Sequence, residues 1–243
     1  MMTPSNPTQR LRALVRKLRI DEIGFAPTST FHGAPQGKQP KDYLPSTVSI
    51  ISIGYHLNQS AIQNLPKSRS AYMLEHDYAN LHLIGCSQRI VRFLEAEGCE
   101  ALGFDAGAGF YTRLSDTSQG LAGDFSHKHA AHACGLGSFG VNNLILTANY
   151  GPRIRFTSIL TSAELPNTRV HGSNLCRSPA CDACVQVCPV GALDGWKDSY
   201  NASEGWRIAK RKCYTYIFDT LSGQRCGLCI KACPVGLPAP HDR

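Results

Sequence analysis

Eight cysteines in the last third of the chain form two copies of a short metal-binding pattern. Each copy reads Cys-x2-Cys-x3-Cys-Pro, with one further cysteine upstream of it. In chain order the two sets are Cys176, Cys181, Cys184 and Cys188, then Cys213, Cys226, Cys229 and Cys233. Thiolates at this spacing are typical ligands of 4Fe–4S clusters. The sequence therefore predicts two such clusters and, with them, the chemistry of one-electron transfer.

The cysteine that precedes each proline is expected to bind the cluster of the other copy, as in two-cluster ferredoxins. The resulting set for cluster 1 is Cys176, Cys181, Cys184 and Cys233. The resulting set for cluster 2 is Cys188, Cys213, Cys226 and Cys229. The gap between Cys176 and Cys181 is longer than the two-residue gap of bacterial ferredoxins, so the ligand at Cys176 is left open.

A pair of zinc sites is the main alternative, because Cys-x2-Cys is also a zinc-binding spacing. Zinc gives no reason for a Cys-Pro tail after both copies, whereas an iron–sulfur protein does. The N-terminus has no apolar core of the signal-peptide type, and no apolar run is long enough to span a membrane. Reduced, metal-binding thiolates in a cytoplasmic protein are therefore favoured over a disulfide framework.

The overall charge says little about partners once the clusters are included. The chain carries a formal charge of +7 when every cysteine is counted as neutral. Two oxidised clusters with their thiolates would each add about −2 and bring the total to about +3. Basicity is then weak support for a nucleic-acid partner.

The elements that must position these cysteines lie in a longer front segment. An amphipathic helix is predicted over residues 8–19, and a buried strand over 48–55. The longest helix is predicted over 78–97, and two strands joined by a turn over 143–161. The stripe expected to be buried on the longest helix consists of Leu83, Cys86, Ile90 and Leu94. Because strands and helices do not alternate regularly, the pattern favours a layered α+β domain.

The composition turns polar after residue 162, and this change predicts a domain boundary near residue 168. Residues 1–168 would form the front domain, and residues 169–243 the cluster domain. No internal repeat is present besides the duplicated cysteine pattern.

The segment 126–166 resembles the hallmark segment of epoxyqueuosine reductases and their relatives. That hallmark is an alanine-rich helix, then Gly-Leu-Gly-x-x-Gly, then two strands around a Tyr-Gly turn. The matching positions are Gly135, Leu136, Gly137, Gly140, Leu144, Tyr150, Gly151, Ile159, Leu160 and Thr161. Residues 20–27 and 43–55 also resemble the opening strands of the family, so the likeness covers nearly the whole chain.

The resemblance implies a nitroreductase-like domain that holds cobalamin or a related corrinoid, as in reductive dehalogenases. A dicluster domain similar to bacterial ferredoxins would follow it. The implied activity is that of an iron–sulfur reductase, in which two 4Fe–4S clusters pass electrons to the corrinoid. The substrate would be a small molecule or a modified nucleoside, and an external donor such as ferredoxin or flavodoxin would supply the electrons.

Two other functions stay open. The chain could be an electron-transfer or corrinoid-handling protein that serves a partner, with a flavin or no second cofactor in place of the corrinoid. It could also be an epoxyqueuosine reductase that acts on tRNA. The chain stops ten residues after Cys233, where that family continues into a helical-repeat domain that grips tRNA, so a short form without that domain is expected. The twin-arginine leader of exported dehalogenases is not expected either.

The candidate catalytic residues are proton donors. In the family an aspartate lies upstream of the Gly-Leu-Gly motif, and in register that position is Leu121. Two aspartates lie near it, Asp116 and Asp124, and His127 follows on the next helix. We take Asp124 and His127 as the leading candidates, followed by Asp116.

The candidate cofactor-binding residues come from the same segment, and each also has a simpler packing role. The set is His129, Gly135, Gly137, Gly140, Tyr150 and Arg153. Gly135 is interpreted as a helix C-cap, and the next two glycines permit close approach of either a corrinoid edge or a neighbouring strand. His129 could contact a cofactor or be an ordinary polar helix residue. Arg153 could bind phosphate or propionamide groups, or face solvent.

Overall fold

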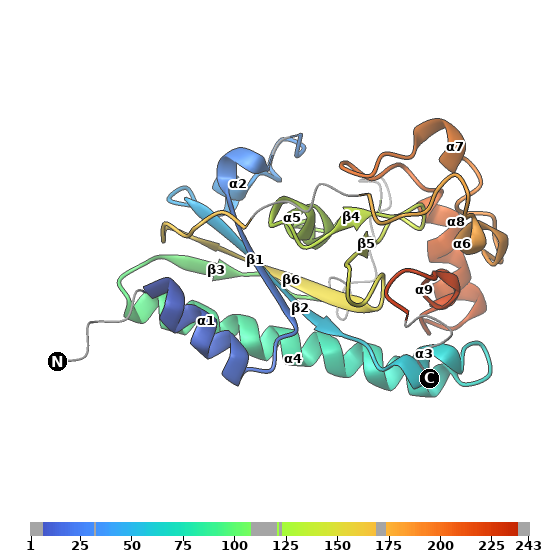
Figure 1. The fold of residues 1–243 in the computed structure, drawn as a ribbon, viewed down its shortest axis with the longest axis horizontal. Helices are drawn as coiled ribbons and strands as arrows, with labels where there is room; N and C mark the ends of the chain where they lie inside the picture. Colours follow the sequence, from blue (N-terminus) through green and yellow to red (C-terminus); the bar gives the residue numbers. More distant parts are fainter. Residues whose placement is uncertain (1–6, 32, 108–120, 122, 169–173, 238–243) are drawn as a thin grey trace.

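The computed structural model describes residues 7–31, 33–107, 121, 123–168 and 174–237. At its centre is an antiparallel sheet with the strand order β1-β2-β6-β3 (Figure 1). The strands are β1 (Glu22–Pro27), β2 (Ser49–His56), β3 (Ala101–Gly103) and β6 (Ile154–Thr161). β2 and β6 form the middle of the sheet and pair along their whole length, from Ser49 opposite Thr161 to His56 opposite Ile154.

Helices cover both faces of this sheet, which explains why β2 is apolar on both sides. On one face lie α1 (Pro7–Lys17) and α4 (Arg69–Ala96), packed against Ile51 and Ile53. On the other face lies α5 (His127–Ala133), packed against Ile50. A mixed helix-and-sheet fold, as the sequence predicts, is thereby confirmed.

The predicted helix over 8–19 and the predicted strand over 48–55 correspond to α1 and β2. The stripe of Leu83, Cys86, Ile90 and Leu94 is buried against the sheet, as expected. The longest helix, however, begins at Arg69 rather than at Tyr78, because the Ser68 hydroxyl caps it by accepting a hydrogen bond from the Ala71 amide. The added turns extend α4 beyond the sheet toward the cysteine-rich segment (Figure 1).

The family-like segment contributes a second, small sheet. Its strands are β4 (Ser138–Phe139) and β5 (Ile145–Leu146). β5 leads through a turn closed by a bridge between Thr147 and Gly151 into β6, which confirms the two strands predicted around that turn. The remaining short elements of the front segment are η1 (Thr28–Thr30), α2 (Pro40–Tyr43) and α3 (Gln59–Gln63).

Residues 174–237 cover one end of the central sheet (Figure 1). They fold as short helices, namely α6 (Ala183–Gln186), α7 (Trp196–Ser199), α8 (Lys210–Thr215), the π-helical turn η3 (Tyr216–Thr220) and α9 (Leu228–Ala232). The two cysteine copies are carried by α6 and α9, which pack against each other. None of the helices in the described ranges is long and apolar enough to cross a membrane.

Candidate functional site

The structure gathers the eight cysteines into the two sets expected from crossed ligation. A small cavity is lined by Cys176, Cys181, Cys184 and Cys233. A second cavity, of about 1110 Å³, is lined among others by Cys188, Cys213, Cys226 and Cys229. Cys188 thus stands with the second copy, and Cys233 with the first. We refer to these groups as site 1 and site 2.

The geometry of each set fits a cluster better than a single ion. Among the described residues, no three His, Cys, Asp or Glu side chains converge closely enough to hold one metal ion. A tetrahedral zinc site draws its sulfurs to about 2.3 Å from one centre. A cubane cluster instead binds each thiolate to a different iron and therefore needs the four sulfurs farther apart.

The thiols of both sites require a metal to carry negative charge. Burial and, after it, the neighbouring thiols Cys233, Cys176 and Cys181 raise the pKa of Cys184 to about 12. Burial likewise raises the pKa of Cys229, together with Cys226 and Cys213. Metal binding offsets this penalty, because the positive irons stabilise the thiolate form. The donor sets therefore fit two 4Fe–4S clusters.

The turn at Tyr150-Gly151 anchors the end of the second cysteine copy. A Cβ atom on Gly151 would lie 1.9 Å from the Val235 carbonyl oxygen, and one on Gly236 would lie 2.1 Å from the Gly151 amide nitrogen. Arg153, which is buried, donates hydrogen bonds to the carbonyl oxygens of Val235 (2.7 Å) and Cys233. The structure thus uses Arg153 to hold the backbone beside site 1, not to line the large cavity.

The glycines of the Gly-Leu-Gly motif also pack against protein. Gly135 follows the end of α5 with a φ of 73° and caps that helix. A Cβ atom on Gly137 would lie 2.1 Å from the Leu146 carbonyl oxygen, so the close approach there is to β5. Gly140 lines the small cavity of site 1 and meets the Asn142 side chain. Of the two roles that the sequence left open for these glycines, the structure displays the packing role.

Tyr150 has a comparable position outside the large cavity. Its ring stacks on His56 with a centroid distance of 5.0 Å, and its amide donates to the Thr147 hydroxyl at 3.1 Å. Burial raises the pKa of Tyr150, and the nearby charges of Asp21 and Glu22 raise it in the same direction. The structure therefore brings neither Tyr150 nor Arg153 together with the cavity-lining residues.

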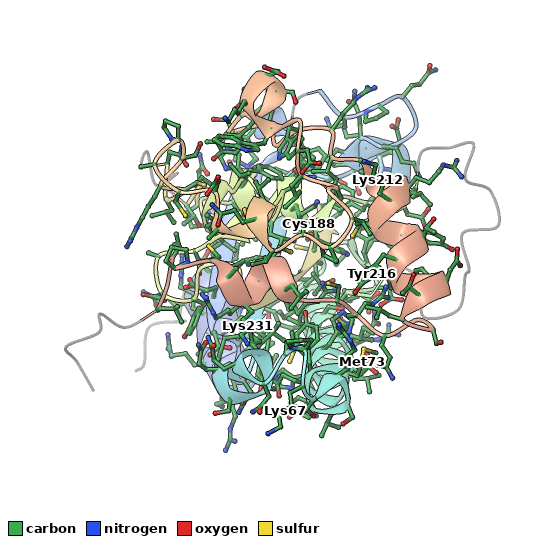
Figure 2. All side chains as sticks on the ribbon, turned by 90° about the vertical axis from the view of Figure 1, so that its right-hand side faces the viewer. Lys67, Met73, Cys188, Lys212, Tyr216 and Lys231 are labelled. Atoms are coloured by element: carbon green, nitrogen blue, oxygen red, sulfur yellow. The ribbon has the colours of Figure 1, made fainter. Side chains whose placement is uncertain are left out.

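The large cavity lies between the central sheet and the cluster segment. Its walls come from α4, α5 and β6 on one side and from residues 188–230 on the other. Figure 2 looks onto this end of the molecule, with Cys188 near the middle and Tyr216 on the adjoining helical segment; both residues line the cavity. At about 1110 Å³ the cavity exceeds the usual range of 300–1,000 Å³ for small-molecule pockets. It has room for a large cofactor.

Asp124 is placed at the cavity as a proton donor would be. Its side chain is 86 % exposed, and its Oδ1 lies 3.6 Å from Lys38 Nζ, another cavity-lining residue. The Tyr43 hydroxyl donates a hydrogen bond to the Asp124 backbone carbonyl and fixes the loop before α5. The carboxyl group is thus exposed to solvent and paired with Lys38 where both residues line the cavity.

His127 lines the cavity, but both of its ring nitrogens are hydrogen-bonded to other residues of the protein. Its Nε2 donates to the Asp105 carbonyl oxygen at 2.8 Å, and its Nδ1 accepts from the Ser158 hydroxyl at 2.9 Å. Burial lowers the pKa of His127 to about 4. The ring is therefore neutral at physiological pH, with both nitrogens engaged. Asp116, the third candidate donor, lies outside the described residues.

His129, which lies two residues after His127 on α5, also lines the cavity. Its Nδ1 accepts from the Ser126 hydroxyl at 2.6 Å, and its Nε2 donates to the Glu204 carbonyl oxygen at 3.1 Å. Burial lowers its pKa. His129 therefore joins α5 to the cluster segment at the cavity wall.

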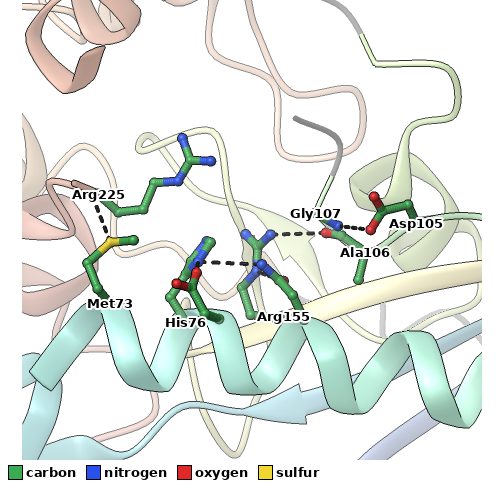
Figure 3. A network of polar contacts seen from close by, with 9 residues as sticks. Met73, His76, Asp105, Ala106, Gly107, Arg155 and Arg225 are labelled. Atoms are coloured by element: carbon green, nitrogen blue, oxygen red, sulfur yellow. Dashed lines mark hydrogen bonds and ion pairs between the residues drawn. The ribbon is translucent and has the colours of Figure 1, made fainter. Parts of the chain in front are cut away.

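Sequence reasoning missed most of the polar floor of the cavity. Figure 3 shows it along α4, with His76, Arg155 and Arg225 close together. Arg155 Nε donates to Asn80 Oδ1 at 3.0 Å, and Nη2 donates to the Ala106 carbonyl oxygen at 3.1 Å. The sequence does indicate Arg155, which alternates with Arg153 on one strand face and, like it, could bind phosphate or propionamide groups or face solvent. It does not indicate that the two arginines serve different sites.

Comparisons with known proteins agree with this arrangement. The family of 4Fe–4S dicluster domains matches residues 176–237. The chain is 26 % identical over 235 residues to an epoxyqueuosine reductase of Gloeobacter violaceus, a match that covers 89 % of this chain and 65 % of that protein. It is 31 % identical over 114 residues to a tetrachloroethene reductive dehalogenase of Desulfitobacterium hafniense, covering 41 % of this chain and 20 % of that protein.

Solved structures share the fold. An epoxyqueuosine reductase bound to a stem loop of epoxyqueuosine-modified tRNA-Tyr matches with a TM-score of 0.62 and 20 % identity, covering 95 % of this chain and 66 % of that one. The epoxyqueuosine reductase of Streptococcus thermophilus matches with a TM-score of 0.60 and 16 % identity, covering 96 % and 68 %. A catabolic reductive dehalogenase in complex with 3-bromo-4-hydroxybenzoic acid matches with a TM-score of 0.73 and 18 % identity, covering 96 % and 33 %.

The resemblance inferred from the sequence is thereby confirmed, and both classes of relative are reductases. The dicluster match indicates two 4Fe–4S clusters. The chain spans 65 % of the length of the epoxyqueuosine reductase and 20 % of the length of the dehalogenase that it matches.

Proposed function

We propose that this chain is an iron–sulfur reductase whose two 4Fe–4S clusters, at sites 1 and 2, deliver electrons to a corrinoid in the large cavity. The substrate is a small molecule or a modified nucleoside. The front segment, up to about residue 168, is the nitroreductase-like domain that holds the corrinoid, and the remainder is the cluster domain. An external donor such as ferredoxin or flavodoxin supplies the electrons.

The position of site 2 is the single observation that carries this proposal. All four of its cysteines line the large cavity, whereas the four cysteines of site 1 line a different one. A cluster at site 2 is therefore in the wall of the space where a reducible group would bind, and a cluster at site 1 is one step behind it. Two clusters in series with a cavity form a path for electrons that ends at a bound molecule.

The residues around the cavity fit a corrinoid. The space is large, and its walls combine apolar side chains such as Phe31 and Ile154 with cationic and histidine side chains. When bound, a corrinoid supplies a strongly reducing cobalt centre, which is the chemistry that protein side chains lack. The protein would contribute binding, orientation, electron delivery and a proton.

Asp124 is the proposed proton donor. Its carboxyl lies at the cavity and in contact with solvent, so it can be reprotonated after each turnover. His127, neutral and bonded at both ring nitrogens, is the proposed positioning residue for α5.

A second candidate is an epoxyqueuosine reductase that acts on tRNA. The match to the Gloeobacter violaceus protein covers 89 % of this chain and favours it. The two candidates differ in what must bind. A tRNA substrate requires measurable affinity for an RNA stem loop with a strong dependence on salt, which a small-molecule reductase does not require.

The proposal is tested by preparing the protein without oxygen and measuring its iron, its sulfide and its affinity for cob(II)alamin. We expect about eight iron and eight sulfide per chain. We also expect paramagnetic resonance to show a bound corrinoid. Stoichiometric zinc without iron would contradict the clusters, and failure to bind any corrinoid would favour the electron-transfer alternative.

Asp124→Asn separates proton donation from cofactor binding. We expect the variant to keep its iron and its corrinoid affinity and to lose turnover by about 10²-fold or more, the usual contribution of general acid catalysis. Asp198→Asn, on α7, is the matched control because that acid does not line the cavity. Equal turnover in both variants would leave Asp124 without this role.

A further inference from the structure

Several cationic side chains gather on the floor of the large cavity. Three of them are Arg155 on β6, Arg225 in the cluster segment and Lys128 on α5. The charge of Arg155 interacts with that of each of the other two. Each lines the cavity, and none of them takes part in an ion pair within the described part of the chain. Buried or half-buried cations without an ion-pair partner are costly, so such a group favours the binding of an anion.

Arg155 is oriented toward this shared space. Its Nε and Nη2 are held by Asn80 and by the Ala106 carbonyl, which fixes the plane of the guanidinium. Among the described residues, Nη1 has no hydrogen-bond partner. A guanidinium with one edge fixed and one nitrogen free can bind an oxyanion with little loss of conformational entropy.

The two other cations lie close enough to Arg155 to interact with its charge. The guanidinium of Arg225 lies over the Phe218 ring, 5.5 Å from its centroid, and its side chain makes no hydrogen bond within the described residues. Lys128 Nζ donates to the Asn143 carbonyl oxygen at 2.9 Å. Burial lowers the pKa of Lys128 to about 8, and the nearby charges of Lys210 and Arg155 act in the same direction as smaller causes.

The acids near this floor are already engaged. Asp77 Oδ1 lies 3.0 Å from His76 Nδ1, and Asp105 Oδ1 accepts from the Gly107 amide at 2.8 Å. Neither forms an ion pair with Arg155. Burial and the Arg155 charge lower the pKa of His76 to about 4, so this histidine is neutral at physiological pH. Asp105 and Asp77 therefore offset part of the Arg155 charge without forming an ion pair with it.

We propose that Arg155, Arg225 and Lys128 form an oxyanion site on the cavity floor, which binds a carboxylate or a phosphate of the molecule held there. The inference names the chemical class of the ligand of the proposed reductase and to that extent rests on the proposed function. The oxyanion has two possible sources, namely an acidic substrate or a phosphate of the cofactor. A third group, the cluster at site 2, could instead be the counter-charge, because Arg225 adjoins Cys226.

The test is calorimetric binding of benzoate, with benzamide as its neutral isostere, to cluster-loaded protein. We expect benzoate to bind and benzamide to bind at least tenfold more weakly. Arg155→Gln should reduce benzoate affinity at least tenfold, while Arg155→Lys should retain part of it. Arg89→Gln removes one exposed positive charge from α4, away from the cavity, and should leave the affinity unchanged.

Arg225→Gln is a second variant that guards against a folding defect, because the Arg225 side chain has no hydrogen bond in the described part of the chain to lose. It should also weaken benzoate binding. Repeating the titration with protein loaded with cobinamide, which lacks the nucleotide phosphate, and with cobalamin identifies the source. Benzoate binding to both forms supports an acidic substrate, and binding to the cobinamide form alone supports the cofactor phosphate.

Equal affinity for benzoate and benzamide would overturn the inference. So would an Arg155→Gln variant that shifts the reduction potential of a cluster but leaves benzoate affinity unchanged, because the cations would then serve the cluster. Iron and corrinoid contents are measured on the same samples. If the protein binds benzoate but no corrinoid, the proposed function is contradicted and the oxyanion site is supported. If it binds a corrinoid but no benzoate, only the oxyanion site is contradicted.

Discussion

At the scale of single residues, the cavity contains histidines that the protein keeps neutral. His127 is half-buried and exchanges hydrogen bonds with Ser158 and the Asp105 carbonyl. Protonation would place a donor opposite the Ser158 hydroxyl and a charge in a desolvated position close to Arg155. The low pKa of His127, about 4, follows chiefly from that burial.

This pKa makes stability depend on pH in a defined direction. The unfolded chain protonates His127 near pH 6.5, while the folded chain does so only near pH 4. Between these values the unfolded state binds more protons, so the free energy of unfolding decreases as the pH falls through this window and is unaffected above it. At pH 5.5 the contribution is about 1 kcal/mol.

Denaturation of wild type and His127→Gln at pH 7.5 and pH 5.5 checks this. We expect the wild type to lose about 1 kcal/mol more than the variant on acidification. Lys197→Gln, an exposed substitution on α7, should behave like the wild type. A pH dependence unchanged by His127→Gln would show that this histidine titrates normally in the folded protein.

At the scale of elements, the segment between α5 and β6 packs against the cluster segment and is hydrogen-bonded to it. Phe139 donates its amide to the Ala202 carbonyl and accepts from the Tyr200 hydroxyl at its own carbonyl. The Trp206 indole donates to the Val141 carbonyl. Val235 is also held at the Tyr-Gly turn. These contacts show that the small residues of this segment allow protein elements to pack closely against one another.

Glycine substitutions test this structural role directly. An Ala at Gly137 would place its Cβ 2.1 Å from the Leu146 carbonyl oxygen, a backbone atom that cannot move alone. We expect Gly137→Ala to destabilise the protein by about 1–3 kcal/mol, measured by denaturation of the protein with and without corrinoid.

Gly85→Ala is the control, because nothing lies within 4 Å of that Cβ on α4. It should stabilise the protein by about 0.5–1 kcal/mol. A Gly137→Ala protein of normal stability that has lost only corrinoid affinity would restore the cofactor role that its sequence motif first suggested.

The two cysteine copies predict an unusual pattern of iron loss. If Cys188 belongs to site 2, removing it together with Cys226 destroys one cluster and leaves about four iron per chain. Removing Cys184 together with Cys188 destroys both clusters and leaves almost none. Iron and sulfide analysis of the two double alanine variants decides between crossed and uncrossed ligation, since uncrossed ligation reverses the two results. Each single variant should retain about four iron.

The sequence predicted those elements whose residues repeat with a clear period or spacing. The stripe on α4 from Leu83 to Leu94 and the apolar run of β2 were found because they bury side chains against one continuous sheet. The first turns of α4, before Tyr78, were missed because Tyr72 and the polar His76 are the buried side chains there. Two such residues do not form an apolar repeat that the sequence could reveal.

The same limit applies to the candidate site. The cysteine sets were predicted from their spacing and from the crossed ligation of two-cluster ferredoxins, and in the structure the members of each set line one cavity. The sequence did not predict where the side chains of Arg153 and Arg155 lie. The two residues are two positions apart on one strand, yet their side chains reach different sites. Arg153 meets the Val235 carbonyl and Arg155 meets Asn80. Only the three-dimensional course of residues 188–237 separates them.

At the scale of the whole molecule, the arrangement requires that electrons enter from outside and leave toward the cavity. Exposed basic residues precede Cys213, a member of site 2, at the start of α8; these are Lys210, Arg211 and Lys212. Figure 2 places Lys212 on the face that also presents Cys188, and Lys231 lies on the same face. An acidic electron donor would be attracted to this face by charge.

Replacing Lys210, Arg211 and Lys212 by glutamine tests whether this face receives the donor. We expect the second-order rate of cluster reduction by an acidic ferredoxin or flavodoxin to fall about tenfold or more at low ionic strength. The difference from wild type should shrink as salt rises, because the Debye length falls from about 30 Å at 0.01 M to about 10 Å at 0.1 M. Stopped-flow absorbance of the clusters measures both.

The control variant replaces Arg16 and Lys17 at the end of α1, which Figure 1 shows on the opposite side of the sheet from the cluster segment. It alters net charge by a comparable amount but should leave the rate and its salt dependence close to those of the wild type. Reduction by dithionite, a small reductant that needs no docking surface, should be similar in all three proteins. If the α8 variant accepts electrons from the acidic donor as fast as the α1 variant does, the donor docks elsewhere. Its electrons would then enter through site 1, whose cysteines line the other cavity.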